Sequence, residues 1–238
     1  MTDASLVPGA LNFRDVGGLP AGERMTRSGV LFRSGNLAQI EADGATALRG
    51  IGLRRIIDLR DDDEVRTSPS RVDGLDLHMQ RVPLFLGSIA SFFERDASLD
   101  EFYQALVDDS APQILEVVRG ILADQPVLVH CTVGKDHTGV TVALTLAAVG
   151  VDEDAVVADY ARTETMLPEA RNRAIIERLR TLHPEAVHLE DLTTRSPAPV
   201  MRAMLGGLTE RYGAPVEYLR SLGLSDDELA ELRRILVS

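Results

Sequence analysis

Several residue types are scarce in this chain, and each scarcity excludes a class of protein. One cysteine among 238 residues leaves no partner for an internal disulfide and suits a reducing compartment. Tryptophan is absent and aromatic residues make up 4% of the chain, so few side chains can stack on nucleic-acid bases. Basic residues number 25 against 37 acidic ones, a formal net charge of −12. We therefore expect no nucleic-acid partner, because such partners need a basic surface.

Long hydrophobic runs are also missing. The longest, "VTVALTLAAVGV" (140–151), contains two threonines and is shorter than the roughly 20 residues that span a bilayer. The stretch "MTDASLVPGALNFRD" (1–15) lacks the basic start and apolar core of a secretory signal. We expect a cytoplasmic protein without a transmembrane segment, with export that uses no recognisable signal as the alternative.

The composition that remains is that of a globular protein, with 45% hydrophobic and 26% charged residues. We expect residues 1–238 to form a single domain. Strand-like apolar stretches at 29–35, 53–60, 77–86 and 126–131 alternate with helical patterns. This alternation predicts an α/β fold, with a central, mostly parallel sheet flanked by helices. After residue 138 the pattern is helical almost to the end of the chain.

A long helical stretch at 88–122 separates two of the predicted strands. It is longer than a simple crossover requires, and it is interrupted at Ala111-Pro112. A helical lid inserted over a site would explain the extra length, and ordinary packing is the alternative.

The chemistry is concentrated in "VLVHCTVGKDHTGV" (127–140). The apolar strand would place Cys131 at the carboxyl edge of the sheet, where open α/β folds bind ligands. The backbone N–H groups of 132–137 and the amino-terminal end of a helix starting at Thr138 would form a cradle for a phosphate dianion. Gly134 and Gly139 would allow the close approach that such a cradle needs. The residues expected to bind phosphate are Thr132, Val133, Gly134, Lys135, His137 and Thr138.

The same positive environment would activate the sulfur. A free thiol has a pKa of about 8.5, which a helix amino terminus and nearby cations can lower. We therefore expect Cys131 to be a thiolate that attacks phosphorus and forms a cysteinyl-phosphate intermediate. His130 would orient the loop, and Thr138 would offer a hydroxyl to the sulfur.

Simpler interpretations exist for each feature. A lone cysteine after an apolar strand is usually a small buried hydrophobic residue, and "GKDHTG" alone is a common turn. Their combination between an apolar strand and an apolar helix favours the phosphate site. His78, His183 and His188 have no metal-ligand spacing, and the acidic run at 58–64 is typical of a solvated strand end. We expect neither a metal nor a cofactor.

Five segments resemble the bacterial cysteine-dependent tyrosine phosphatases of the mycobacterial PtpB type, within the broader Cys-x5-Arg phosphatase class. The loop together with the order of the segments makes the resemblance specific. The segments are "NFRDVGG" (12–18), "GVLFRSGNL" (29–37), "IGLRRIIDLRDDDEV" (51–65), 126–164 and 212–236.

The resemblance implies a tyrosine-phosphatase-like fold and a metal-free phosphatase. Its substrate would be phosphotyrosine, and in some members phosphoserine, phosphothreonine or phosphoinositides. The family pattern His-Cys-x-x-Gly-Lys-Asp-Arg-Thr-Gly places the nucleophile at Cys131, and Lys135 and Asp136 match its basic and acidic residues. Family members also carry a helical lid, which would fit residues 88–122.

Two departures from the pattern weaken catalysis more than phosphate binding. His137 occupies the place of the loop arginine. The strand that precedes a loop aspartate in relatives reads "VPLFLGS" (82–88) here, without a carboxylate, so the leaving-group acid would have to be Asp136.

Three functions therefore compete. The first is a phosphomonoesterase for a phosphorylated protein or phospholipid, slowed by His137. The second is a pseudophosphatase that binds phosphorylated ligands without efficient turnover. A sulfurtransferase is the third, but it gives Asp136 and Thr138 no role.

Overall fold

A computed structural model of the chain describes residues 6–84 and 94–238. Its main sheet has five strands in the order β1-β4-β7-β5-β6. The strands β4, β7, β5 and β6 are parallel, and β1 pairs with β4 in the antiparallel direction. The sheet confirms the predicted α/β class. Each of its four parallel strands is shorter than the apolar stretch that predicted it, and β1 was not predicted. The strand bounds are β1 (Arg14–Asp15), β4 (Leu31–Ser34), β5 (Arg55–Asp58), β6 (His78–Arg81) and β7 (Val127–His130), with a separate hairpin of β2 (Pro20–Ala21) and β3 (Arg24–Met25).

Successive side chains of a strand point to opposite faces of the sheet, and each face packs into its own hydrophobic cluster. Ile56 and Leu128 belong to the cluster that includes Leu48 of α1. Ile57 and Val129 belong to the larger cluster on the other face, which most of the remaining helices complete. The sheet is therefore buried on both sides, as parallel sheets are.

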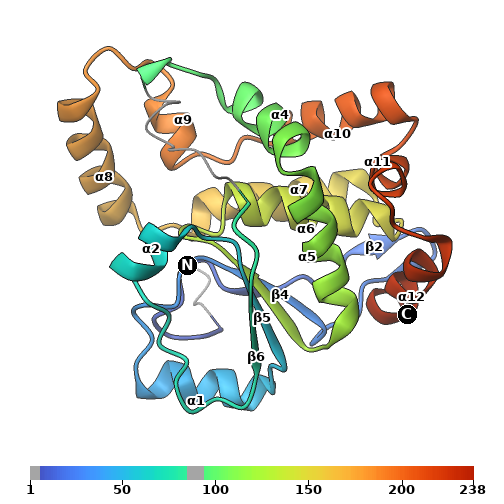
Figure 1. The fold of residues 1–238 in the computed structure, drawn as a ribbon. Coiled ribbons are helices and arrows are strands. Elements are labelled where there is room, and N and C mark those ends of the chain that lie inside the picture. Colours follow the sequence, from blue (N-terminus) through green and yellow to red (C-terminus); the bar gives the residue numbers. More distant parts are fainter. Residues whose placement is uncertain (1–5, 85–93) are drawn as a thin grey trace.

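Helices surround the sheet in the arrangement that Figure 1 shows. Two capping boxes that follow the Ser-x-x-Glu pattern start α4 and α12, the first at Ser98 and Glu101 and the second at Ser225 and Glu228. The apolar helix predicted from Thr138 is α6, which begins two residues earlier, at Asp136. The helix bounds are α1 (Ala42–Ile51), α2 (Asp62–Thr67), α4 (Leu99–Asp109), α5 (Ala111–Ala123), α6 (Asp136–Ala148), α7 (Glu153–Met166), α8 (Glu169–Leu182), α9 (Leu189–Thr193), α10 (Ala198–Tyr212), α11 (Pro215–Ser221) and α12 (Asp226–Leu236).

The predicted lid segment is only partly described, because residues 88–93 lie outside the described ranges. The rest of it forms α4 and α5, which break at Ala111-Pro112 as predicted. Both helices bury apolar faces in the larger cluster, among them Tyr103 and Val117. They form a packed wall in this structure, and a lid role for residues 88–122 stays a prediction.

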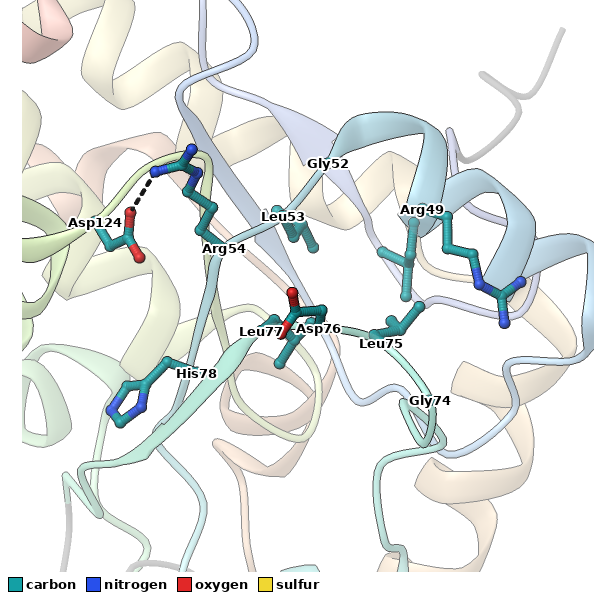
Figure 2. A pocket seen from close by; sticks show the side chains of 11 residues that line it. Arg49, Gly52, Leu53, Arg54, Gly74, Leu75, Asp76, Leu77, His78 and Asp124 are labelled. Atoms are coloured by element: carbon teal, nitrogen blue, oxygen red, sulfur yellow. Dashed lines mark ion pairs between the residues drawn. The ribbon is translucent and has the colours of Figure 1, made fainter.

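A hollow of about 710 Å³ lies at the amino-terminal ends of β5 and β6. Figure 2 shows Arg54 paired with Asp124 at one end of it and Arg49 directed away at the other. The carboxyl ends of the strands carry the Cys131 region, on the opposite edge of the sheet. Because ligands of open α/β folds bind at the carboxyl edge, we look for the active site there.

Within the described ranges, no helix has both the length and the apolar composition that crossing a bilayer requires.

Candidate active site

The strand register brings three chain segments together at the carboxyl edge of the sheet. Ser34 of β4 and Asp58 of β5 both lie opposite His130, the last residue of β7. Cys131 follows immediately and starts the turn into α6, which begins at Asp136. We call residues 131–137 the Cys131 loop.

The Cys131 loop folds back over its own sulfur. Cys131 is only 6% exposed, and its Sγ accepts a hydrogen bond from the N–H of Gly134 at 3.2 Å. Gly134 has φ +75, and a Cβ there would lie 2.4 Å from the backbone of Ser34. Only glycine fits this position, so the sequence itself enforces the close turn that the cradle needs.

The carbonyls of the loop are held by the protein around it. Gly134 O accepts from Asn12 Nδ2 and from Arg33 Nη2, each at 3.0 Å, and Thr132 O accepts from the N–H of Asn36 at 3.1 Å. In a trans peptide the next N–H points opposite to the carbonyl. The N–H groups of Val133 and Lys135 therefore point away from these partners, as phosphate binding requires.

A buried ion cluster fixes Arg33 in place. Asp159 of α7 accepts from Arg33 Nη1 at 2.6 Å and from Arg14 Nε at 2.8 Å, and all three side chains are almost fully buried. Burial opposes the charge of Asp159, but the two guanidinium groups dominate and lower its pKa to about 2. Burial and the neighbouring Arg33 lower the pKa of Arg14 to about 10. The cluster is thus a charged scaffold for the loop.

Sequence reasoning missed this scaffold. Arg14, Arg33 and Asn12 lie inside the "NFRDVGG" and "GVLFRSGNL" segments, and Asp159 lies in a helix 126 residues from Arg33. An arginine in an otherwise apolar strand was the available signal, since arginine is rarely buried without a partner.

His130 lies beneath the loop in a second polar cluster. Its Nδ1 is 3.4 Å from Cys131 O, and its Nε2 is 3.6 Å from Asp58 Oδ2. Burial lowers the pKa of His130 despite this carboxylate. Asp58 is itself paired with the buried Arg60 at 2.7 Å. The prediction that 58–64 is a solvated strand end is therefore wrong for Asp58 and Arg60, whose mutual pairing makes their burial possible.

Lys135 and Asp136 form an ion pair at 2.6 Å between Nζ and Oδ1. Lys135 is fully buried, and its Nζ also donates to Asp191 O of α9 at 3.2 Å. Asp136 Oδ1 accepts a further bond from the Tyr103 hydroxyl at 2.9 Å, and Tyr103 contacts the Tyr160 hydroxyl at 2.7 Å. The structure brings both predicted loop residues to the site. In this structure the Lys135 ammonium binds Asp136 and the carbonyl of Asp191. The predicted contact of Lys135 with phosphate therefore stays a prediction.

His137 and Thr138 occupy the first turn of α6. The ring of His137 packs against Phe102, with centroids 5.9 Å apart. It is partly exposed as a residue, but its Nε2 atom is buried and has no hydrogen-bond partner among the described residues. Burial lowers the pKa of His137, although Asp136 and Glu64 oppose this effect. Thr138 is fully buried, and its hydroxyl makes no bond to the sulfur within the described ranges, so the predicted contact with the sulfur is not found in this structure.

A cavity of about 280 Å³ opens over the loop. Its floor consists of Cys131, Thr132, Val133, Asp136 and His137. Its walls come from helices that Figure 1 shows gathered at this end of the molecule, α2, α4, α8 and α9. The wall residues are Glu64, Phe102, Arg171, Ile175, Leu179, Leu192 and Thr193.

The wall residues were also missed from the sequence. Arg171, Ile175 and Leu179 are spaced at i, i+4 and i+8 on α8, so they share one face of that helix. Glu64 receives a hydrogen bond from Thr132 Oγ1, which ties α2 to the floor. The periodicity of α8 was visible in the sequence, but nothing in it identified the surface that this face covers.

The described residues contain no group of three or more histidine, cysteine, aspartate or glutamate side chains arranged to hold a metal ion.

Comparison with known proteins gives consistent results. Residues 6–238 match the model of a family described as "Tyrosine phosphatase family". The chain is 34% identical to the triple specificity protein phosphatase PtpB of Mycobacterium tuberculosis, over 97% of this chain and 98% of that protein. It is 31% identical to a tyrosine-protein phosphatase of Nostoc commune, over 84% of this chain and 72% of that protein. Among solved structures, the core catalytic domain of the PP-IP phosphatase SIW14 from S. cerevisiae matches with a TM-score of 0.44 and 16% identity, covering 75% of this chain and 96% of that one.

Proposed function

The chain belongs to the tyrosine phosphatase family, and from this premise we propose that it hydrolyses phosphotyrosine with Cys131 as the nucleophile. One observation carries the proposal. The sulfur lies on the floor of the cavity, and the N–H of Gly134 in the same loop donates to Sγ at 3.2 Å. This is the arrangement that stabilises both a thiolate and the phosphate it attacks.

The reaction proceeds in two displacements. The thiolate of Cys131 attacks phosphorus, the ester P–O bond breaks, and the leaving oxygen takes a proton from the carboxyl group of Asp136, which recovers one from the attacking water in the second step. Water then attacks the cysteinyl phosphate, and the S–P bond breaks to release inorganic phosphate and restore the thiolate. The loop N–H groups and the positive end of α6 neutralise the phosphoryl oxygens through both steps.

The cavity walls favour an aromatic substrate. Phe102, Ile175, Leu179 and Leu192 give the walls an apolar character above the polar floor. A phenyl ring buries apolar surface there, whereas the short side chain of phosphoserine does not. We therefore propose phosphotyrosine as the preferred substrate, with phosphoserine, phosphothreonine and phosphoinositides as further candidates.

The test is phosphate release from a phosphotyrosine peptide by the parent chain and by Cys131→Ser. We expect the serine variant to lose turnover and to retain phosphate affinity, because the loop amides hold the oxyanion. Turnover by Cys131→Ser within severalfold of the parent would exclude the cysteine mechanism. Loss of the parent's activity on treatment with a chelator would point to a metal-dependent one.

A second candidate is a phosphate-binding domain without efficient turnover. The observation that favours it is His137, because burial favours the uncharged form of its ring where the family pattern has an arginine. Under this alternative the parent binds a phosphotyrosine peptide as tightly as Cys131→Ser does, and phosphate release stays at the background rate.

A further inference from the structure

We propose that Arg171, on α8, supplies the charged phosphate-binding group that the Cys131 loop itself lacks. This inference rests on the proposed function and names a residue outside the loop that would contact the transferred phosphoryl group. Arg171 and Cys131 line the same cavity. Their positions, 40 residues apart in sequence, are brought together only by the fold.

The cavity needs a cation that the loop does not provide. Two carboxylate residues, Glu64 and Asp136, line it. Lys135, the only lysine in the chain, is buried in its contacts with Asp136 and Asp191, and burial keeps His137 toward its neutral form. Among the lining residues that the structure describes, this leaves Arg171 as the one cationic side chain that is charged at every physiological pH.

The guanidinium of Arg171 is also available to bind an anion. Its hydrogen bond goes to the neighbouring Asn172 Oδ1 at 3.0 Å, and it forms no ion pair with the described residues. Burial lowers the pKa of Arg171, with no compensating carboxylate. A partly buried and unpaired guanidinium is unfavourable, and an anionic ligand in the cavity would supply the missing charge.

The helix that carries Arg171 can adjust its position. None of the 14 residues of α8 is buried, so the helix is held weakly and packs chiefly against α9. A guanidinium on such a helix can approach the phosphate as the substrate enters. It would then grip two phosphoryl oxygens at once, which a single histidine nitrogen does not do.

The test compares Arg171→Met with Arg173→Met, using nitrophenyl phosphate as substrate and orthophosphate as competitive inhibitor. Arg173 is the matched control, because it lies on the same helix in an exposed pair with Glu169. We expect Arg171→Met to lower kcat/KM by on the order of 10²–10³, the usual effect of losing one well-placed donor. It should also weaken orthophosphate inhibition at least about tenfold, while Arg173→Met changes neither quantity.

Rescue gives a second, independent readout. We expect His137→Arg to raise turnover more in the Arg171→Met background than in the parent, because the loop arginine would replace the missing group. Arg171→Lys keeps the positive charge but loses the two-pronged guanidinium. Its kcat/KM should lie between those of the parent and Arg171→Met, and it replaces Arg171→Met in the test if that variant does not fold.

Two results would overturn the assignment. One is an orthophosphate affinity that Arg171→Met leaves unchanged. This result would overturn the assignment even if larger substrates bound more weakly, because Arg171 would then contact a part of the substrate far from the phosphate. The other is an equal gain from His137→Arg in both backgrounds. Cys131→Ser separates this failure from failure of the proposed function: if it abolishes turnover while Arg171→Met is fully active, only the role of Arg171 is lost.

Discussion

At the scale of single residues, we expect the position after Asp136 to set the rate of the proposed reaction. An arginine there would be charged at every physiological pH and would bind two oxygens. Burial lowers the pKa of His137 below its ordinary value, which disfavours the charged ring at neutral pH. A bound phosphate acts in the opposite direction by favouring the imidazolium.

We expect His137→Arg to raise turnover of nitrophenyl phosphate at least about tenfold at neutral pH, which corresponds to only about 1.4 kcal/mol of transition-state stabilisation. The parent should have an acid-shifted optimum that the variant lacks, because only the parent depends on protonation of residue 137. The measurement is kcat/KM against pH for both proteins. Full activity of the parent at pH 8 would show that His137 does not act as a weakened arginine.

Asp136 has two possible roles, as leaving-group acid and as a brace that holds Lys135 and Tyr103. We expect Asp136→Asn to slow alkyl and phenyl phosphates far more than nitrophenyl esters, because a basic leaving group needs a proton and an activated one does not. Tyr103→Phe is the control for the brace, since it removes one contact to Asp136 and leaves the carboxylate. An equal loss across the leaving groups would assign Asp136 to structure alone.

At the scale of elements, the loop between β7 and α6 is shaped by β1, β4 and α7. Asp159 of α7 orients Arg33, and Arg33 in turn binds the carbonyl of Gly134. Replacing buried ion pairs by apolar groups can be neutral, but removing one partner leaves a buried charge unpaired. Stability and loop geometry therefore depend on the same cluster.

We expect Asp159→Asn to lower the free energy of unfolding by about 3–5 kcal/mol, because two buried arginines lose their counter-charge. Urea unfolding measures this, and Asp154→Asn is the control, since Asp154 is 88% exposed in its pair with Arg202 and should change stability by less than about 1 kcal/mol. The pKa of Asp159 is about 2, below its ordinary value of 3.8. The contribution of the ionised Asp159 carboxylate to the free energy of unfolding should be complete above about pH 4 and should be lost as the pH falls toward 2. A loss no larger than that of the control would show that the cluster is not needed for stability.

At the scale of the whole molecule, different helices cover the two faces of the sheet. The candidate active site lies at the carboxyl edge of the sheet, where α8, a helix without buried residues, forms part of the cavity wall. The net charge of −12 gives an anionic substrate no long-range attraction. We therefore expect recognition to depend on local groups, which are the loop amides, the amino-terminal end of α6 and Arg171 in the cavity wall.

His130, which is buried, and His137, whose Nε2 atom is buried, should make the free energy of unfolding depend on pH. Burial lowers the pKa of both His130 and His137, so below the ordinary histidine value of about 6.5 the unfolded chain binds more protons than the folded one. Stability should therefore fall as the pH is lowered from about 7 to 5. Urea unfolding at several pH values measures the slope, and His137→Gln should reduce it. A flat profile over this range would contradict the burial of both rings.

Local sequence patterns were enough to predict the α/β class, the four parallel strands of the main sheet, the apolar helix after Cys131 and the Cys131 loop. Such patterns include apolar runs of strand length, capping residues and the glycine at position 134. Each acts over a few neighbouring residues, so its effect can be predicted from the local sequence. The position of Cys131 between a buried strand and an apolar helix was enough to place it at the carboxyl edge of the sheet.

Only the tertiary structure decided what surrounds the loop. Asn12, Arg33 and Asp159 contact the loop or one another across 100 residues or more of sequence, and α8 brings Arg171 to the cavity. Such contacts depend on how the strands are ordered and the helices packed, which no local pattern encodes. The same is true of Asp58 and Arg60: their charges predicted solvation, and the pairing that allows their burial exists only in the folded chain.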